Sequence, residues 1–246
     1  MPPTVPPTLA PTLAHAQRHR SDAAARAAPS KVNALLLHRA AKPAVFAAAL
    51  LPFAYLLWGA IADKLGANLA EALIRGTGDW TLRLLCLTLA VTPLRTLTGW
   101  HALARLRRML GLFTFFYGAL HFTAYAWLDM GFEPAAILND IPKRPFILVG
   151  SAALLLMLPL AATSFNRAVK ALGAARWQAL HRTVYAIAAL ALLHFFWMRA
   201  GKNDFAEVGV YAAIVALLLG WRLAAWLGRR RGARGGRPAS APAPGK

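Results

Sequence analysis

Residues 109–128, MLGLFTFFYGALHFTAYAWL, decide the fold, because this run contains no Asp, Glu, Lys or Arg. A helix needs about 20 apolar residues to cross the hydrocarbon core of a membrane. In lipid, backbone polar groups must bond within their own segment, so such a run predicts a transmembrane helix. Similar runs occur at 44–62, 80–98, 146–164, 180–198 and 208–227. We therefore predict an all-α membrane protein, a bundle of six transmembrane helices.

The composition supports a membrane protein over a nucleic-acid-binding one. Hydrophobic residues make up 58% of the chain, above the roughly 45–50% typical of soluble domains. A net charge of +19 would suggest nucleic acid in a soluble protein. Here the charges lie between the apolar runs, and no nucleic-acid-binding module is present in the sequence. The single cysteine, Cys86, excludes an internal disulfide or a cluster held by several thiolates.

The distribution of basic residues predicts the orientation. The segments 1–42, 95–108, 165–182 and 222–246 hold 21 of the 28 Lys and Arg but only one of the nine acids, Asp22. These segments alternate with the less basic connections. The positive-inside rule therefore predicts that both termini lie in the cytoplasm.

Three regions are expected along the chain. Residues 1–40 form a Pro- and Ala-rich disordered tail, 41–227 the transmembrane domain, and 228–246 a basic disordered tail. No nucleotide-binding domain is expected. Gly76-Thr77-Gly78 begins like a dinucleotide loop, but Thr81 stands where the third glycine belongs.

Membrane-buried histidines are the candidate functional residues. Four of the seven histidines lie outside the apolar runs and are read as solvated or interfacial side chains: His15, His19, His38 and His101. The other three, His121, His181 and His194, lie within the third and fifth runs. Burying an ionisable group in a membrane is costly, so each needs a partner or a function.

Equal depth points to a haem held by His121 and His194. Both helices run from the cytoplasm outward, and each histidine lies eight residues before a charged residue, Asp129 or Lys202. Both imidazoles are then about 12 Å inside the outer boundary. They can therefore take the two axial positions of one haem iron. Copper or zinc would want further ligands, which this level does not offer.

A second haem at His181 lacks a matching histidine. His181 lies 13 residues before His194, about 20 Å deeper, and Arg108 stands at the corresponding place on the third run. On a straight helix the two histidines also point to different sides. Arg107 and Arg108 are candidates for binding haem propionates or a cofactor phosphate, or serve only as topology anchors. Arg83 is a candidate propionate partner for the outer haem, or extends to the interface.

Three other functions stay open at this point. A ferric or other transmembrane reductase of similar build would usually carry a flavin domain. A transporter or proton channel could use the histidines as relays, although it would favour acids in mid-membrane. A structural membrane protein could use them as interhelical hydrogen bonds.

An ordered set of motifs carries a family resemblance. Its members are Trp80, Arg83, Thr92-Pro93-Leu94, Arg107-Arg108-Met109-Leu110-Gly111-Leu112, Tyr117, Leu120-His121, Tyr125, Thr163-Ser164, Leu172-Gly173, Arg176-Trp177, Leu180-His181, Val184-Tyr185 and His194. Over residues 40–227 the chain resembles the haem-binding membrane subunit of the bacterial protein-methionine-sulfoxide reductase system, the MsrQ (YedZ) type. That type belongs to the ferric-reductase-like transmembrane group.

The resemblance implies more than the residues do. It implies an inner-membrane b-type cytochrome with FMN as a further cofactor. Its electrons come from the quinone pool or a cytosolic flavin reductase and go to a periplasmic molybdopterin-dependent reductase that repairs oxidised methionines. It implies that His121, His181 and His194 take the family's histidine positions, and it adds Arg176 to the candidates for binding a propionate or phosphate.

Overall fold

The computed structural model describes residues 30–201 and 203–235, and within these residues every regular element is helical. The long helices are α3 (Ala41–Ile61), α4 (Leu69–Thr98), α5 (Arg107–Ala124), α7 (Pro145–Ala162), α10 (Val184–Ala200) and α11 (Ala206–Gly235). The short elements are α2 (Lys31–Leu37), the 3-10 helix η1 (His101–Arg105), the π-helical turn η2 (Tyr125–Asp129), α6 (Pro134–Asp140), α8 (Asn166–Leu172) and α9 (Ala174–His181). The predicted all-α class is confirmed for the described residues.

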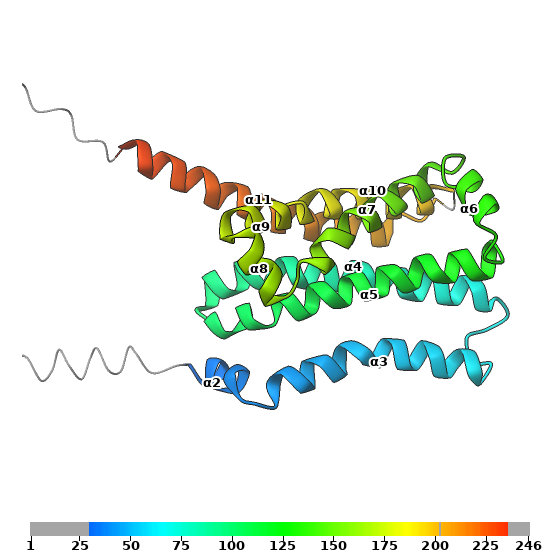
Figure 1. The fold of residues 1–246 in the computed structure, drawn as a ribbon, viewed down its shortest axis with the longest axis horizontal. Helices are drawn as coiled ribbons and strands as arrows, with labels where there is room; N and C mark the ends of the chain where they lie inside the picture. The colour runs from blue at the N-terminus through cyan, green and yellow to red at the C-terminus, as the bar shows by residue number, and fades with distance from the viewer. Residues whose placement is uncertain (1–29, 202, 236–246) are drawn as a thin grey trace, which may run out of the picture.

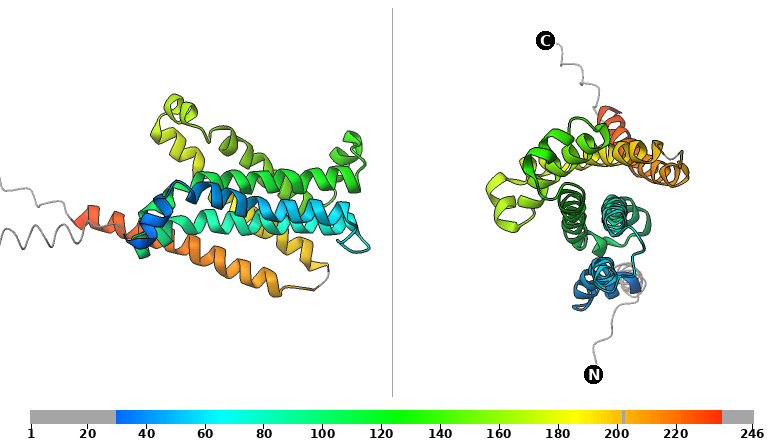
Figure 2. Two further views of the ribbon diagram at one scale, coloured as in Figure 1. Left: turned by 90° about the horizontal axis from the view of Figure 1, so that it is seen from below. Right: turned by 90° about the vertical axis from the view of Figure 1, so that its right-hand side faces the viewer.

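The long helices run side by side, alternately up and down (Figure 1). Viewed end-on in Figure 2, α3 lies on one side, α4 and α5 lie in the middle, and α7, α10 and α11 cover the other side. The most extensive packing is between α4 and α5 and between α7 and α10. Helices α2, α8 and α9 and the end of α11 lie at one end of the bundle, which we call the α2 end. Helix α6 lies at the opposite, α6 end.

Five segments of the described chain are long and apolar enough to span a membrane. They are Ala41–Ile61, Arg107–Asp129, Pro145–Ala162, Ala174–Ala200 and Ala206–Arg231. This architecture indicates a multi-pass membrane protein. Helix α4 is not among the five, because charged residues such as Arg75, Asp79 and Arg83 interrupt its apolar sequence.

Helix boundaries differ from the apolar runs in two places. Helix α4 begins at Leu69 rather than at 80, because the Asn68 side chain accepts a hydrogen bond from the Glu71 N–H (3.0 Å) and caps it. The fifth run is broken between α9 and α10, where the Thr183 hydroxyl bonds to the Leu180 carbonyl (2.8 Å). His181 and His194 therefore lie on separate helices, and the straight-helix argument about their faces does not apply.

Both expected tails are partly helical. Residues 31–37 of the expected N-terminal tail form α2, whose Asn33 side chain accepts from Ala102 N–H (3.1 Å) and donates to the Gly99 carbonyl (3.0 Å). Residues 228–235 of the expected C-terminal tail continue α11. The expectations for 1–29 and 236–246, including His15 and His19, lie outside the described residues.

Tyr117 fastens α5 to a proline-containing part of α3. Its fully buried hydroxyl accepts from the Phe53 N–H (2.9 Å) and donates to the Ala49 carbonyl (2.8 Å), a pair that would bond directly in a regular helix. Pro52 lies beside this insertion and cannot donate a hydrogen bond of its own. The Tyr117 hydroxyl therefore joins α5 to α3 next to Pro52, and Tyr117 lies one turn before His121 on α5.

Tyr117→Phe is expected to lower the free energy of unfolding by about 1–3 kcal/mol, because two buried hydrogen bonds are lost. Thermal unfolding of the detergent-solubilised protein measures the effect. Tyr55→Phe is the control, since Tyr55 is exposed on the same helix as Pro52. An equal Tm for the Tyr117 variant and the parent would show that the hydroxyl contributes nothing.

Candidate haem site

The structure brings His121 of α5 and His194 of α10 together inside the bundle. Their ring centroids lie 5.9 Å apart and their planes are inclined by 79°. Metal–imidazole bonds of about 2.0–2.1 Å on two sides of one metal would place the ring centres roughly 6 Å apart. The observed spacing therefore fits two imidazoles that would hold one iron between them.

Hydrogen bonds to backbone carbonyls set the protonation of both rings. His121 Nδ1 lies 2.8 Å from the Ile74 carbonyl oxygen, and His194 Nδ1 lies 2.6 Å from the Phe146 carbonyl oxygen. A carbonyl only accepts, so each ring carries its proton on Nδ1. The Nε2 lone pair of each neutral imidazole is then available to a metal, as in most metal-binding histidines.

A glycine makes room for each imidazole. Gly78 of α4 and Gly150 of α7 each lie four residues after the residue whose carbonyl the histidine bonds. A Cβ on Gly78 would lie 3.1 Å from His121 Nδ1, and one on Gly150 would lie 2.7 Å from His194 Nδ1. The same arrangement thus occurs twice, once in the α4–α5 pair and once in the α7–α10 pair. In the sequence, Gly78 was noticed only as the end of Gly76-Thr77-Gly78, an incomplete dinucleotide loop, and Gly150 was not noticed.

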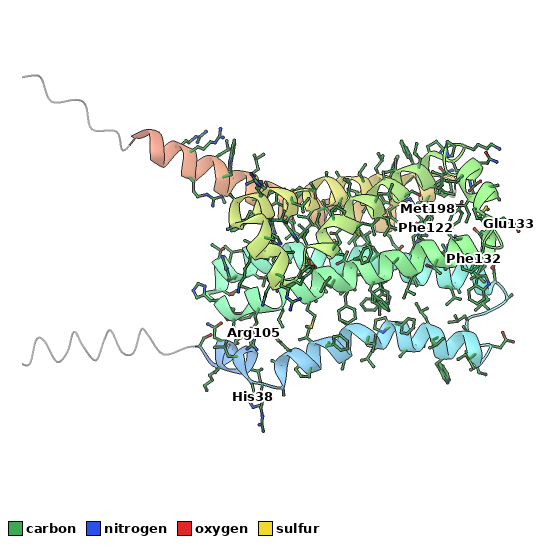
Figure 3. All side chains as sticks on the ribbon, in the orientation of Figure 1. His38, Arg105, Phe122, Phe132, Glu133 and Met198 are labelled. Atoms are coloured by element: carbon green, nitrogen blue, oxygen red, sulfur yellow. The ribbon has the colours of Figure 1, made fainter. Side chains whose placement is uncertain are left out.

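A cavity of about 430 Å³, the first cavity, adjoins both histidines. Phe122 of α5 and Met198 of α10, both labelled in Figure 3, are among its mostly apolar lining residues. Within the described residues, no three His, Cys, Asp or Glu side chains are grouped to bind a bare metal ion. Two imidazoles in an apolar cavity suit haem, which brings the remaining ligands itself.

The sequence predicted Arg83 at the first cavity, but two other arginines line it. Arg83 is not among its lining residues; its guanidinium lies over the Trp80 ring (5.0 Å) and donates to the Tyr211 hydroxyl (3.3 Å). Arg75 and Arg144 line the cavity instead. Neither stood out in the sequence, because both lie outside the apolar runs.

Arg144 belongs to a polar network at the α6 end. Its Nε lies 2.9 Å and 2.8 Å from the two Asp140 carboxylate oxygens, its Nη2 pairs with the same carboxylate, and the Tyr125 hydroxyl also donates to it (2.7 Å). Tyr125 begins the π-helical turn η2 and, like Arg144, lines the first cavity. The network therefore holds η2 to the segment that precedes α7.

The Arg144 hydrogen bonds hold the pKa of Asp140 below its usual value. The ionised Asp140 carboxylate therefore contributes its full stabilisation of the fold at pH values above the unfolded-state pKa, about 3.9. This stabilisation is lost as the pH falls through the folded-state pKa.

We expect Asp140→Asn to lower the Tm at neutral pH and to reduce the Tm loss between about pH 6 and about pH 3. Asp63→Asn, which removes an exposed carboxylate without an ion pair in the described chain, is the control. The assignment is wrong if both variants follow the parent's pH profile.

A second cavity of about 300 Å³ lies toward the α2 end. Arg107, Arg108, Trp177 and His181 line it, whereas Arg176 is exposed and does not. His181 stacks on Trp177, with ring centroids 3.9 Å apart, and its Nε2 lies 3.2 Å from the Thr163 hydroxyl. The lining includes the Thr88 hydroxyl, which is buried without a hydrogen-bond partner in the described structure. Of the four arginines predicted from the sequence, Arg107 and Arg108 therefore meet at a cavity with one histidine, whereas Arg83 and Arg176 do not line it.

Comparison with known proteins relates the chain to haem-binding membrane subunits. A family model described as the ferric reductase like transmembrane component matches residues 77–192. The protein-methionine-sulfoxide reductase heme-binding subunit MsrQ of Polaromonas naphthalenivorans is 68% identical over 188 residues, covering 76% of this chain and 86% of that protein. Its counterparts in Bordetella pertussis and Xanthomonas campestris are 57% and 48% identical, each over 78% of this chain and over 93% and 89% of their own lengths. No solved structure matches the chain.

Proposed function

Because the chain belongs to the family of MsrQ heme-binding subunits of protein-methionine-sulfoxide reductase, we propose that it carries electrons through the membrane by a haem b that His121 and His194 hold. The observation that carries this proposal is the facing pair of imidazoles, each with Nδ1 bonded to a carbonyl and Nε2 left for iron. When bound, haem supplies a reversible one-electron change at iron.

The chain's own residues set the conditions for that electron. Ile74 and Phe146 orient the imidazoles and fix their tautomers through their carbonyls. Apolar side chains such as Phe122 and Met198 lower the dielectric constant around the bound cofactor, which would raise the influence of nearby charges on the iron. The cations Arg75 and Arg144 line the same cavity and are candidates to bind the propionates.

In the proposed topology the bundle lies in the inner membrane of a bacterium, and α4 is a sixth membrane span. Both termini lie in the cytoplasm. Helix α4 supports this, because its 30 residues lie alongside α5 within the bundle. The charge distribution supports it as well. All eight acids of the described chain lie toward the α6 end, and the basic connections lie at the α2 end. The first cavity would then adjoin the periplasmic side.

A second cofactor is proposed for the second cavity. Arg107 and Arg108 would bind its anionic groups, and His181 and Trp177 would contact its ring system. FMN and a second haem b are both compatible with these groups. Electrons would arrive here from the quinone pool or from a cytosolic flavin reductase.

The proposed acceptor is a separate periplasmic, molybdopterin-dependent reductase that repairs oxidised methionines in envelope proteins. The names of the relatives support this partner class, because they describe a subunit of a protein-methionine-sulfoxide reductase. The first cavity lies toward the α6 end, where such a partner would receive the electron.

The test begins with haem and flavin quantitation per polypeptide in the purified protein. The chemically reduced protein is then mixed with the separate reductase and a methionine sulfoxide. We expect the haem to be reoxidised only when both the reductase and the methionine sulfoxide are present. A ferric chelate is offered in parallel, because a transmembrane ferric reductase would be reoxidised by it alone. A protein purified without haem would contradict the proposal and favour a transporter or structural role.

A further inference from the structure

Pro93 leaves an acceptor without a donor in the interior of α4. A proline has no N–H, so the Leu89 carbonyl one turn earlier loses its regular hydrogen bond. Arg222 of α11 replaces that donor, with Nη2 2.6 Å from the Leu89 oxygen. Its Nη1 donates to the Tyr185 hydroxyl of α10 (2.8 Å). A single guanidinium therefore joins three helices at the proline.

The charge of Arg222 is not needed for these two hydrogen bonds. Both partners are neutral, and within the described chain Arg222 forms no ion pair, since the acids lie toward the α6 end. Its Nε is buried without a hydrogen-bond partner. A buried cation without a carboxylate carries a desolvation cost that a neutral amide donor would avoid. The Arg222 guanidinium also lies over the Tyr185 ring, with Cζ 5.2 Å from the ring centroid, and Arg222 belongs to the basic segment 222–246. Neither feature supplies a negative charge to balance this half-buried cation.

The second cavity lies beside this charge. Thr88 precedes Leu89 and Val184 precedes Tyr185, and both Thr88 and Val184 line the cavity. Arg107, which also lines it, interacts electrostatically with Arg222 and Tyr185. In surroundings of low dielectric constant a charge acts over a longer range than in water. A negative charge in the second cavity would therefore be stabilised by Arg222.

We propose that Arg222 is a positioning residue of the electron path, anchored by the carbonyl that Pro93 leaves free, and that its charge favours the reduced state of the cofactor in the second cavity. The inference rests on the proposed function, which places a cofactor there. Reduction adds one negative charge to that cofactor, and the fixed cation stabilises it. Arg222 thus raises the midpoint potential where electrons arrive.

The experiment is a redox titration of the purified full chain, followed by absorbance. The signal of the second cavity is the one lost in His181→Ala. We expect Arg222→Gln to lower the midpoint potential of that signal and to leave the potential of the His121/His194 haem unchanged. Arg222→Lys keeps the positive charge, so its midpoint potential for that signal is expected to stay close to the parent's. Arg229→Gln is the matched control, because Arg229 is an exposed cation on the same helix.

Pro93→Ala separates the charge from the packing. Arg222→Gln is expected to lower the Tm, because the Leu89 carbonyl loses its donor. The alanine introduced by Pro93→Ala has an N–H that can bond to this carbonyl, so the double variant Pro93→Ala/Arg222→Gln is expected to regain that Tm. Its midpoint potential is expected to stay low. A potential that returns with Pro93→Ala, or that never changes in Arg222→Gln, would overturn the proposal. If the parent protein holds no cofactor sensitive to His181→Ala, the proposed function has failed at this cavity, and this is seen before Arg222 is changed.

Discussion

Replacing His121 or His194 by alanine is expected to remove nearly all haem absorbance from the purified protein. Each variant leaves the iron with one protein ligand, and the loss of one iron–imidazole bond is expected to let haem dissociate during purification. The visible spectrum, normalised to protein, and haem content per polypeptide measure the loss. Both variants should show it equally, since the two imidazoles have equivalent hydrogen bonds and equivalent positions.

His101→Ala is the matched control, because His101 is exposed in η1 at the α2 end. Helical circular dichroism and size-exclusion behaviour identify a variant that has merely failed to fold. Haem and imidazole added together should restore part of the low-spin spectrum to His121→Ala and His194→Ala, because free imidazole can take the place of the missing side chain. The ligand assignment is wrong if both variants keep a full Soret band.

Gly150→Ala is expected to weaken haem binding by about 10–100-fold, the range found when groups that orient a metal ligand are changed. The new Cβ would lie 2.7 Å from His194 Nδ1 and 2.9 Å from Cε1, so the ring must move away from α7. That movement breaks the hydrogen bond to the Phe146 carbonyl, which orients the ring. Titration of the haem-free protein with haem measures the affinity.

Gly209→Ala provides the control for the helical substitution itself, since a Cβ there meets open space. Gly78→Ala should have a smaller effect than Gly150→Ala, because its Cβ would lie 3.1 Å from the His121 ring. Equal haem affinities for Gly150→Ala and Gly209→Ala would show that the close approach to His194 has no functional role.

Hydrophobic run length was sufficient to predict most of the bundle. Five of the six runs correspond to helices that are long and apolar enough to span a membrane. The run at 80–98 became part of the longer α4, whose Asn68 cap and charged first turns extend beyond any apolar pattern. The helices in 31–37 and 228–235 were missed because contacts such as that of Asn33 with Gly99 are formed between distant segments.

The candidate ligands were found from depth alone, whereas their surroundings were not. Residue spacing along a helix sets the height of a side chain, so His121 and His194 could be matched at one level. The direction in which a side chain points depends on how each helix is rotated in the bundle. For that reason Arg83 was expected at the first cavity, which Arg75 and Arg144 line instead.

The sequence by itself determined a helical membrane protein, the common level of His121 and His194 and the family to which the chain belongs, because these depend on composition, spacing and motif order along one chain. Only the tertiary structure decided which carbonyls orient the imidazoles, which glycines admit them, and that Arg222 supplies the donor that Pro93 lacks. The hydrogen bonds among these contacts join residues 47, 48 and 133 positions apart. Their geometry follows from how the helices pack against one another, which no local pattern specifies.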